Sequence, residues 1–149
     1  MTGHPEELRL PDPCLVVLVG VSGSGKSTWA ARHFASAQIV SSDALRGVVG
    51  LHERDQRASK DAFAILDQIV DARLRRGLTT VIDSTGLEPD RRVAWLAMAR
   101  RRGRPAHVVV LDVPERQARA HNKARDNPVP SAARLRLTRW LPACRGPAD

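Results

Sequence analysis

The chain has 149 residues, of which 42% are hydrophobic, and it carries a net charge of +8. This length suits one domain with a buried core and is short for two. Apolar runs such as residues 14–19 are far shorter than the roughly 20 residues of a membrane helix. The N-terminus also lacks the basic start and apolar stretch of a signal peptide. We therefore expect a cytoplasmic protein with no membrane partner.

The excess of basic residues, most of them arginine, has two interpretations. The excess of positive charge would serve to bind an anionic partner such as nucleic acid. Alternatively, GC-rich codons would produce the many arginines without any function. Aromatic residues make up only 3% of the chain, so a base-stacking platform is not expected. The two cysteines, Cys14 and Cys144, lie far apart and in no metal-type spacing with histidine. We expect reduced thiols and no structural zinc site.

Short apolar runs alternate with helical patterns along the chain after a loose leader at residues 1–13. This alternation predicts an α/β fold whose parallel sheet carries helices on both faces, in one domain over residues 14–149. The expected strands are residues 14–19, 38–40, 78–82 and 106–111. The expected helices are residues 26–35, 58–76, 89–103, 114–125 and a last one that ends near 141, with an irregular excursion at 47–56.

A glycine-rich motif directly follows the first expected strand and opens the first helix. Gly20, Gly25, Lys26 and Ser27 satisfy the pattern G-x-x-x-x-G-K-[S/T] of a phosphate-binding P-loop. Such a loop turns its backbone N–H groups towards the phosphates of a nucleoside triphosphate, and the helix N-terminus adds partial positive charge. The motif predicts nucleotide contacts from Val21, Ser22, Gly23, Ser24, Gly25, Lys26, Ser27 and Thr28.

Asp43 follows the second strand, and Arg46 lies three residues further on. Ligands of an open parallel sheet bind beyond the carboxyl ends of its strands, so both residues face the crevice that holds the phosphate loop. Asp43 would take the proton of an acceptor hydroxyl, and Arg46 would hold the acceptor or neutralise charge. The alternative is purely structural, with Asp43 as a helix N-cap that pairs with Arg46.

Asp83 ends the third strand after Thr80-Val81-Ile82, which is the pattern of a Walker B segment. Its carboxylate would bind Mg²⁺ directly or through water, together with the Ser27 hydroxyl. An Asx-turn at the end of a strand is the structural alternative.

The expected helix at residues 114–125 is basic and belongs to a lid at about 114–130. A lid arginine would close on the transferring phosphate, and Arg125 is our candidate for it, ahead of His121 and Arg119. For the other basic residues of this helix a solvated charged face is the simpler interpretation.

These motifs together resemble the kinase domain of bacterial polynucleotide kinase-phosphatase, and more distantly the phage polynucleotide kinase. The resemblance spans residues 14–140. It is carried by the phosphate loop, Ser41-Ser42-Asp43-Ala44-Leu45-Arg46, Asp55-Gln56, Val81-Ile82-Asp83-Ser84-Thr85, Pro114-Glu115 and Asn122-Lys123-Ala124-Arg125.

The resemblance implies an ATP- or other NTP-dependent, Mg²⁺-dependent kinase that transfers the γ-phosphate to a 5′-hydroxyl end of DNA or RNA. It implies that Asp43 is the general base, that Arg46 contacts the acceptor end, and that Lys26 and Arg125 stabilise the transferring phosphoryl group. It also implies metal binding by Ser27. The expected fold is a P-loop sheet of about four strands in the order 2-3-1-4.

The chain departs from the family pattern in three places. His121 stands where the lid has arginine, Gly86 replaces an asparagine, and no fifth strand is expected, which would leave the fourth strand as an exposed edge. A kinase for a small-molecule hydroxyl, on a sugar or an antibiotic, and a non-catalytic nucleotide-binding module remain the alternatives. The sequence leaves open the choice between DNA and RNA, the preferred triphosphate and the oligomeric state.

Overall fold

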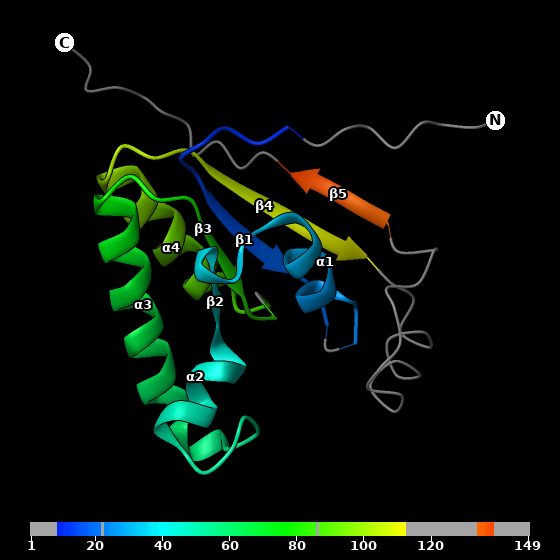
Figure 1. The fold of residues 1–149 in the computed structure, drawn as a ribbon, viewed down its shortest axis with the longest axis vertical. Helices are drawn as coiled ribbons and strands as arrows, with labels where there is room; N and C mark the ends of the chain where they lie inside the picture. Colours follow the sequence, from blue (N-terminus) through cyan, green and yellow to red (C-terminus); the bar gives the residue numbers. More distant parts are fainter. Residues whose placement is uncertain (1–8, 22, 86, 113–133, 139–149) are drawn as a thin grey trace.

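A computed structural model describes residues 9–21, 23–85, 87–112 and 134–138. Within these residues, five strands form one sheet in the order β2-β3-β1-β4-β5 (Figure 1). The first four strands run parallel to one another, which confirms the order 2-3-1-4 expected from the sequence. Their bounds are β1 Leu15–Val19, β2 Ile39–Ser41, β3 Thr80–Asp83, β4 Ala106–Asp112 and β5 Arg134–Thr138.

Helices cover both faces of this sheet, as expected. The central strand β1 is apolar on both sides, so its successive side chains enter two separate cores. Leu15 and Val17 pack with residues of α3 and α4, whereas Val16 and Leu18 pack with Trp29 and Ala30 of α1. The helices are α1 Lys26–His33, α2 Ser42–Val49, α3 Ser59–Arg75 and α4 Pro89–Arg101, with short 3₁₀ turns at η1 Ser36–Gln38 and η2 Gln56–Ala58.

The C-terminal part of the described chain corrects one expectation. Residues 134–138 form a strand, β5, where the sequence analysis expected a helix that ends near 141. The strand pairs antiparallel with β4, from Val108 opposite Thr138 to Asp112 opposite Arg134, so β4 is not the exposed edge that we expected. The sequence 134–138 alternates arginine and leucine with the period of two that indicates a strand. Pairing with the long β4 provides the backbone partners that this segment needs.

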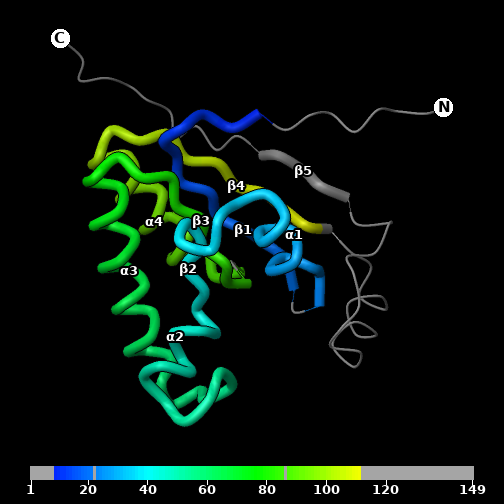
Figure 2. The backbone as a smooth tube through the Cα atoms, in the orientation of Figure 1, coloured from blue at the N-terminus to red at the C-terminus, as the bar shows by residue number. Residues whose placement is uncertain are grey.

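The expected irregular excursion at residues 47–56 is also shorter than predicted. Helix α2 continues to Val49, and residues 50–55 alone connect it to η2. Figure 2 shows α2 leading away from the end of the sheet and the chain turning back beneath the start of α3. The Ser41 side chain caps α2 by accepting a hydrogen bond from the Ala44 N–H, which explains why the helix begins at Ser42.

The parallel topology fixes where a ligand can bind. The carboxyl ends of β1, β2 and β3 lie at the same edge of the sheet, where the chain leads into the phosphate loop, α2 and the residues after Asp83. No helix within the described residues has the length and apolarity needed to cross a membrane.

Candidate active site

The phosphate loop connects β1 to α1 at the centre of this edge. Gly23 and Gly25 have φ angles of 84° and 88°, in the left-handed region that favours glycine. Gly25 is also the N-cap of α1, and no side chain caps this helix. The first-turn N–H groups of α1 are therefore available to a phosphate, as the motif predicts.

Position 20 requires glycine because neighbouring atoms leave no room for a side chain. A Cβ built on it would lie 2.6 Å from Ser24 Oγ and 3.1 Å from the Leu111 carbonyl oxygen. Ser24 is fully buried, and its main-chain N–H donates to the Val21 carbonyl at 3.0 Å. Its hydroxyl has no hydrogen-bond partner among the described residues. The Ser24 side chain thus packs into the loop itself, against Gly20.

Lys26, Ser27 and Asp83 come together at the start of α1. The Ser27 hydroxyl donates a hydrogen bond of 2.6 Å to Asp83 Oδ2, and Lys26 Nζ donates to the Val21 carbonyl at 3.2 Å. Lys26 and Asp83 are each 8% exposed. A hydroxyl beside a carboxylate offers the oxygen ligands that Mg²⁺ prefers, so the two side chains fit the metal role predicted for them.

Burial shifts the pKa values of both charged groups towards their neutral forms. The pKa of Asp83 is raised, chiefly by burial, although the Ser27 hydrogen bond and the Lys26 charge lower it. The pKa of Lys26 is lowered by burial, while the charges of Asp83 and Asp43 raise it. Because Asp43 affects both groups, its carboxylate lies within electrostatic reach of the phosphate loop.

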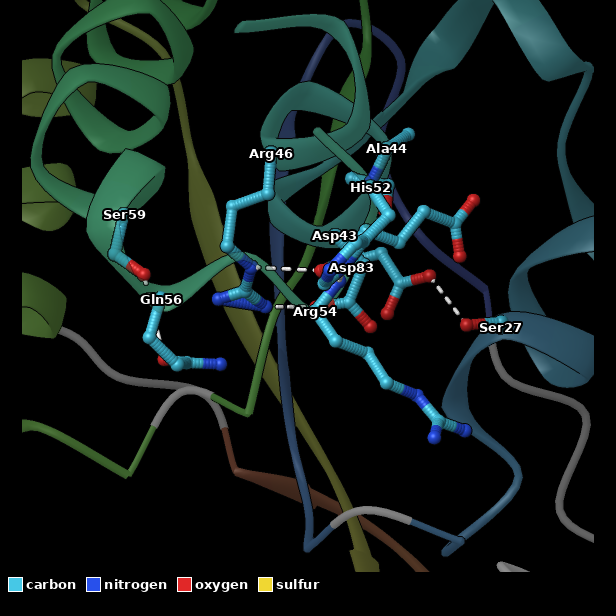
Figure 3. Close-up of polar contacts among 11 residues, drawn as sticks. Ser27, Asp43, Ala44, Arg46, His52, Arg54, Gln56, Ser59 and Asp83 are labelled. Carbon is cyan, nitrogen blue, oxygen red and sulfur yellow. Dashed lines mark hydrogen bonds and ion pairs between the residues drawn. The ribbon is translucent and has the colours of Figure 1, made fainter. Parts of the chain in front are cut away.

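Asp43 and Arg46 lie on successive turns of α2 and form an ion pair (Figure 3). The Asp43 side chain is 66% exposed and accessible to a ligand, whereas that of Arg46 is only 14% exposed. Ser41 caps the helix, so Asp43 is not the N-cap that the structural alternative required, although the expected ion pair is present.

Arg46 has a second partner that the sequence analysis missed. Its Nε donates a hydrogen bond of 3.1 Å to the main-chain carbonyl of Glu53, in the connection between α2 and η2. No side-chain pattern reveals a main-chain acceptor. The sequence held one indirect sign of an ordered turn here, which was Asp55 in an exposed connection. Aspartate in a turn commonly accepts hydrogen bonds from the N–H groups that follow it.

The structure therefore brings together Lys26, Ser27, Asp43, Arg46 and Asp83, which come from three separate segments of the chain. Val21, Gly23, Gly25 and Thr28 lie in the loop and the first turn of α1, as the motif requires. Ser22 and Gly86 fall outside the described residues, as do the lid residues Arg119, His121 and Arg125.

The fold is similar to that of several solved proteins. The structure of a Pnkp1/Rnl/Hen1 complex matches with a TM-score of 0.61 at 21% identity, covering 77% of this chain and 40% of that chain. A structure of the Pnkp1/Rnl/Hen1 RNA repair complex gives 0.62 at 22%, covering 83% and 41%. The PezAT toxin-antitoxin system of Streptococcus pneumoniae gives 0.64 at 16%, covering 80% and 55%.

These likenesses concern the fold, because every identity is below 25%. The chain spans about two fifths to just over half of the length of the solved chains that it matches. At the sequence level, residues 15–143 match the family model described as an AAA domain. The match begins at β1, includes the phosphate loop and Asp83, and covers most of the chain, so this protein belongs to the AAA domain family of P-loop proteins.

Proposed function

We propose that this protein is a Mg²⁺-dependent kinase that transfers the γ-phosphate of ATP, or of another nucleoside triphosphate, to a 5′-hydroxyl end of DNA or RNA. The observation that carries the proposal is the exposed Asp43 carboxylate, paired with Arg46 and within electrostatic reach of Lys26 and Asp83. A module that only bound nucleotide would need the phosphate loop alone. An accessible carboxylate beside it is what a hydroxyl acceptor requires.

In the proposed step the acceptor oxygen attacks the γ-phosphorus while the bond to the oxygen that bridges the β- and γ-phosphorus atoms breaks. The proton of the acceptor hydroxyl passes to the Asp43 carboxylate, and the nucleoside diphosphate leaves. Lys26 holds the β- and γ-phosphates, and Arg46 binds the acceptor end beside Asp43. When bound at Ser27 and Asp83, Mg²⁺ supplies positive charge to the phosphate oxygens.

We assign the remaining contacts to the phosphate loop and the lid. Residues 21–28 bind the triphosphate through main-chain N–H groups, in addition to the Lys26 side chain. The lid at about 114–130 supplies Arg125 to the transferring phosphoryl group. These roles follow from the motif and the family resemblance.

Three observations favour a polynucleotide acceptor over a small alcohol. The Asp43–Arg46 spacing matches the polynucleotide kinase pattern, the net charge is +8, and the fold resembles proteins solved in complexes named for Pnkp1 and RNA repair. A polyanionic acceptor should bind more weakly as salt rises, whereas a neutral metabolite should not.

The direct test is to incubate the protein with γ-labelled ATP, Mg²⁺ and short 5′-OH or 5′-phosphate oligonucleotides of DNA and RNA. Label should enter the 5′-OH strands and not the 5′-phosphate strands. Label on a sugar or antibiotic hydroxyl, with none on any oligonucleotide, would replace the polynucleotide acceptor by a small molecule. Tight nucleotide binding without transfer to any acceptor would indicate the non-catalytic module.

Replacing the proposed base separates catalysis from nucleotide binding. Asp43→Asn should lower kcat by about 10²- to 10⁴-fold, the usual contribution of a general base, and leave the Kd for Mg·ATP within about twofold. Single-turnover transfer and fluorescent-nucleotide titration measure the two quantities. Asp61→Asn, at an exposed position in the first turn of α3, is the matched control. Wild-type transfer by Asp43→Asn would reduce Asp43 to an ion-pair partner of Arg46.

A further inference from the structure

The connection between α2 and α3 is a closely packed turn built around one carboxylate. Asp55 Oδ2 accepts from the Leu51 N–H at 3.0 Å, and Oδ1 accepts from the Arg57 N–H at 3.1 Å. The main chain of Asp55 is bound as well, because its N–H donates to the His52 carbonyl and its carbonyl accepts from the Ala58 N–H. We call residues 50–58 the Asp55 turn.

The Asp55 turn is packed against the end of α2. A Cβ built on Gly50 would lie 2.7 Å from Asp55 Oδ2, 2.7 Å from Ala58 Cβ and 2.9 Å from the Arg46 carbonyl oxygen. A Cβ on Gly47 would lie 3.2 Å from Glu53 Cγ. Gly47 within α2 and Gly50 at its C-cap thus leave room for the turn to pack closely enough against the helix to meet Arg46.

The point of contact is the guanidinium of Arg46. Its Nε donates to the Glu53 carbonyl of the turn, and its Nη2 donates to Asp43 (Figure 3). The first bond fixes the plane of the guanidinium, and the second directs one of its edges towards the exposed carboxylate. A single bond to Asp43 would leave the guanidinium free to rotate out of that plane.

We infer that Asp55 is a positioning residue: its carboxylate holds the turn that presents the Glu53 carbonyl to Arg46, and so orients Arg46 towards the acceptor. The inference rests on the proposed function for the role of Arg46. The Asp55 carboxylate accepts its hydrogen bonds from the main-chain N–H groups of Leu51 and Arg57, which belong to the turn and not to the phosphate loop. Its effect on the reaction passes through Arg46 alone.

This arrangement predicts a change in one kinetic parameter only. Asp55→Ala removes both acceptors and should raise the KM for a 5′-OH oligonucleotide about tenfold, the usual effect of losing one hydrogen bond to a charged group. The KM for ATP should stay unchanged, because Lys26, Ser27 and Asp83 lie outside the turn. Asp55→Asn keeps one acceptor oxygen and should give an intermediate KM. Asp61→Asn, an exposed aspartate just after the turn, should match wild type.

A second measurement tests the positioning without any catalysis. In ¹⁵N-labelled protein, the Arg46 Nε–H should exchange slowly with water because the Glu53 carbonyl accepts it, and Arg46→Lys identifies its signal. Exchange should accelerate in Asp55→Ala and less in Asp55→Asn, and should be unchanged in Asp61→Asn. Thermal melting establishes that each variant is folded, and if Asp55→Ala is not, Asp55→Asn decides both measurements.

The two proposals fail in different ways. If wild-type protein labels no 5′-OH oligonucleotide, the proposed acceptor is wrong, and the Nε–H exchange still tests the role of Asp55. If folded Asp55 variants keep wild-type Nε–H exchange, or raise the KM for ATP as much as that for the oligonucleotide, Asp55 does not position Arg46.

Discussion

The charged residues of the phosphate loop are buried before any ligand arrives. Lys26 and Asp83 are each 8% exposed, and burial is the largest cause of the pKa shift of each. Folding has already removed these charges from water. The desolvation free energy of the two side chains therefore opposes folding, and less of it opposes the binding of a triphosphate with its metal. The two charges also stabilise each other, so neither is isolated in the site.

The raised pKa of Asp83 predicts a pH dependence of metal-assisted nucleotide binding. A metal competes with the proton for this carboxylate, so affinity for Mg·ATP should fall with decreasing pH, beginning above the ordinary carboxyl value of about 4. Asp83→Asn cannot be protonated there and should lose this dependence. Titrations of wild type and Asp83→Asn from neutral pH to about pH 5 isolate Asp83, since titration of the nucleotide is common to both. Parallel curves would contradict the assignment of Asp83 as a metal ligand.

At the scale of elements, α3 and α4 are joined by two contacts of different kinds. Trp95 of α4 is 1% exposed, and its Nε1–H donates to Asp67 Oδ1 of α3 at 2.8 Å. Nearer the ends of both helices, the Arg102 guanidinium donates two hydrogen bonds of 2.9 Å to Asp71. Arg102 lowers the pKa of Asp71, mainly through the hydrogen bond between them. Both of these side chains are 35% exposed, so water reaches the pair and screens their interaction.

Removing the Asp67 carboxylate should therefore lower the stability of the protein more than removing the Asp71 carboxylate. Asp67→Ala leaves the buried Trp95 N–H without its partner, which should lower the free energy of unfolding by about 1–3 kcal/mol. Asp71→Ala leaves Arg102 in water and should cost clearly less. Urea unfolding followed by tryptophan fluorescence compares the two variants under the same conditions. If Asp71→Ala lowered the free energy of unfolding more than Asp67→Ala, the surface ion pair and not the buried Trp95 contact would be the main interaction that stabilises the packing of α4 on α3.

Most helices and strands could be predicted from the sequence, and a few features could not. Four strands were predicted because continuous apolar runs indicate burial, and α3 was predicted from its amphipathic period. Helix α1 was predicted because it follows the phosphate loop, and α4 because Pro89 opens it and Gly103 ends it. β5 was missed because its five residues are too few for their period to outweigh a helical interpretation, and pairing with β4 decides it. Members of the candidate site such as Lys26, Ser27 and Asp83 could be proposed from the sequence because a motif specifies each of them. The Glu53 carbonyl was not, because a main-chain acceptor depends on the path of an irregular turn.

For the whole molecule, strand order separates the phosphate loop of the candidate site from Asp43. The phosphate loop follows the central strand β1, Asp83 ends its neighbour β3, and Asp43 comes after β2, one strand further out. Neighbouring strands are about 4.8 Å apart, so β2, which leads to Asp43, lies roughly 10 Å along the sheet from β1, which leads to the phosphate loop. If Asp43 is the base that we propose, an acceptor would therefore approach from the side of α2 and the Asp55 turn.

The opposite end of the sheet contains a buried thiol that reports on the stability of the whole fold. Cys14 immediately precedes β1 and is fully buried, and its N–H donates to Thr79 Oγ1 at 3.1 Å. Burial, and next the charge of Asp12, raise the pKa of Cys14 from 9.0 to about 11. In the folded protein at neutral pH this thiol is therefore protonated and shielded, and a thiol reagent should reach it only on unfolding.

A raised pKa makes the stability contribution of Cys14 depend on alkaline pH in a known direction. The contribution is fully present below the unfolded pKa of 9.0 and is lost as pH rises towards the folded value of about 11. In a Cys144→Ser background, raising the pH from about 8 to about 10.5 should cost about 2 kcal/mol more with Cys14 than with Cys14→Ala. Urea unfolding at both pH values measures this difference. Equal losses in the two proteins would mean that the Cys14 thiolate forms in the folded state as easily as in the unfolded chain.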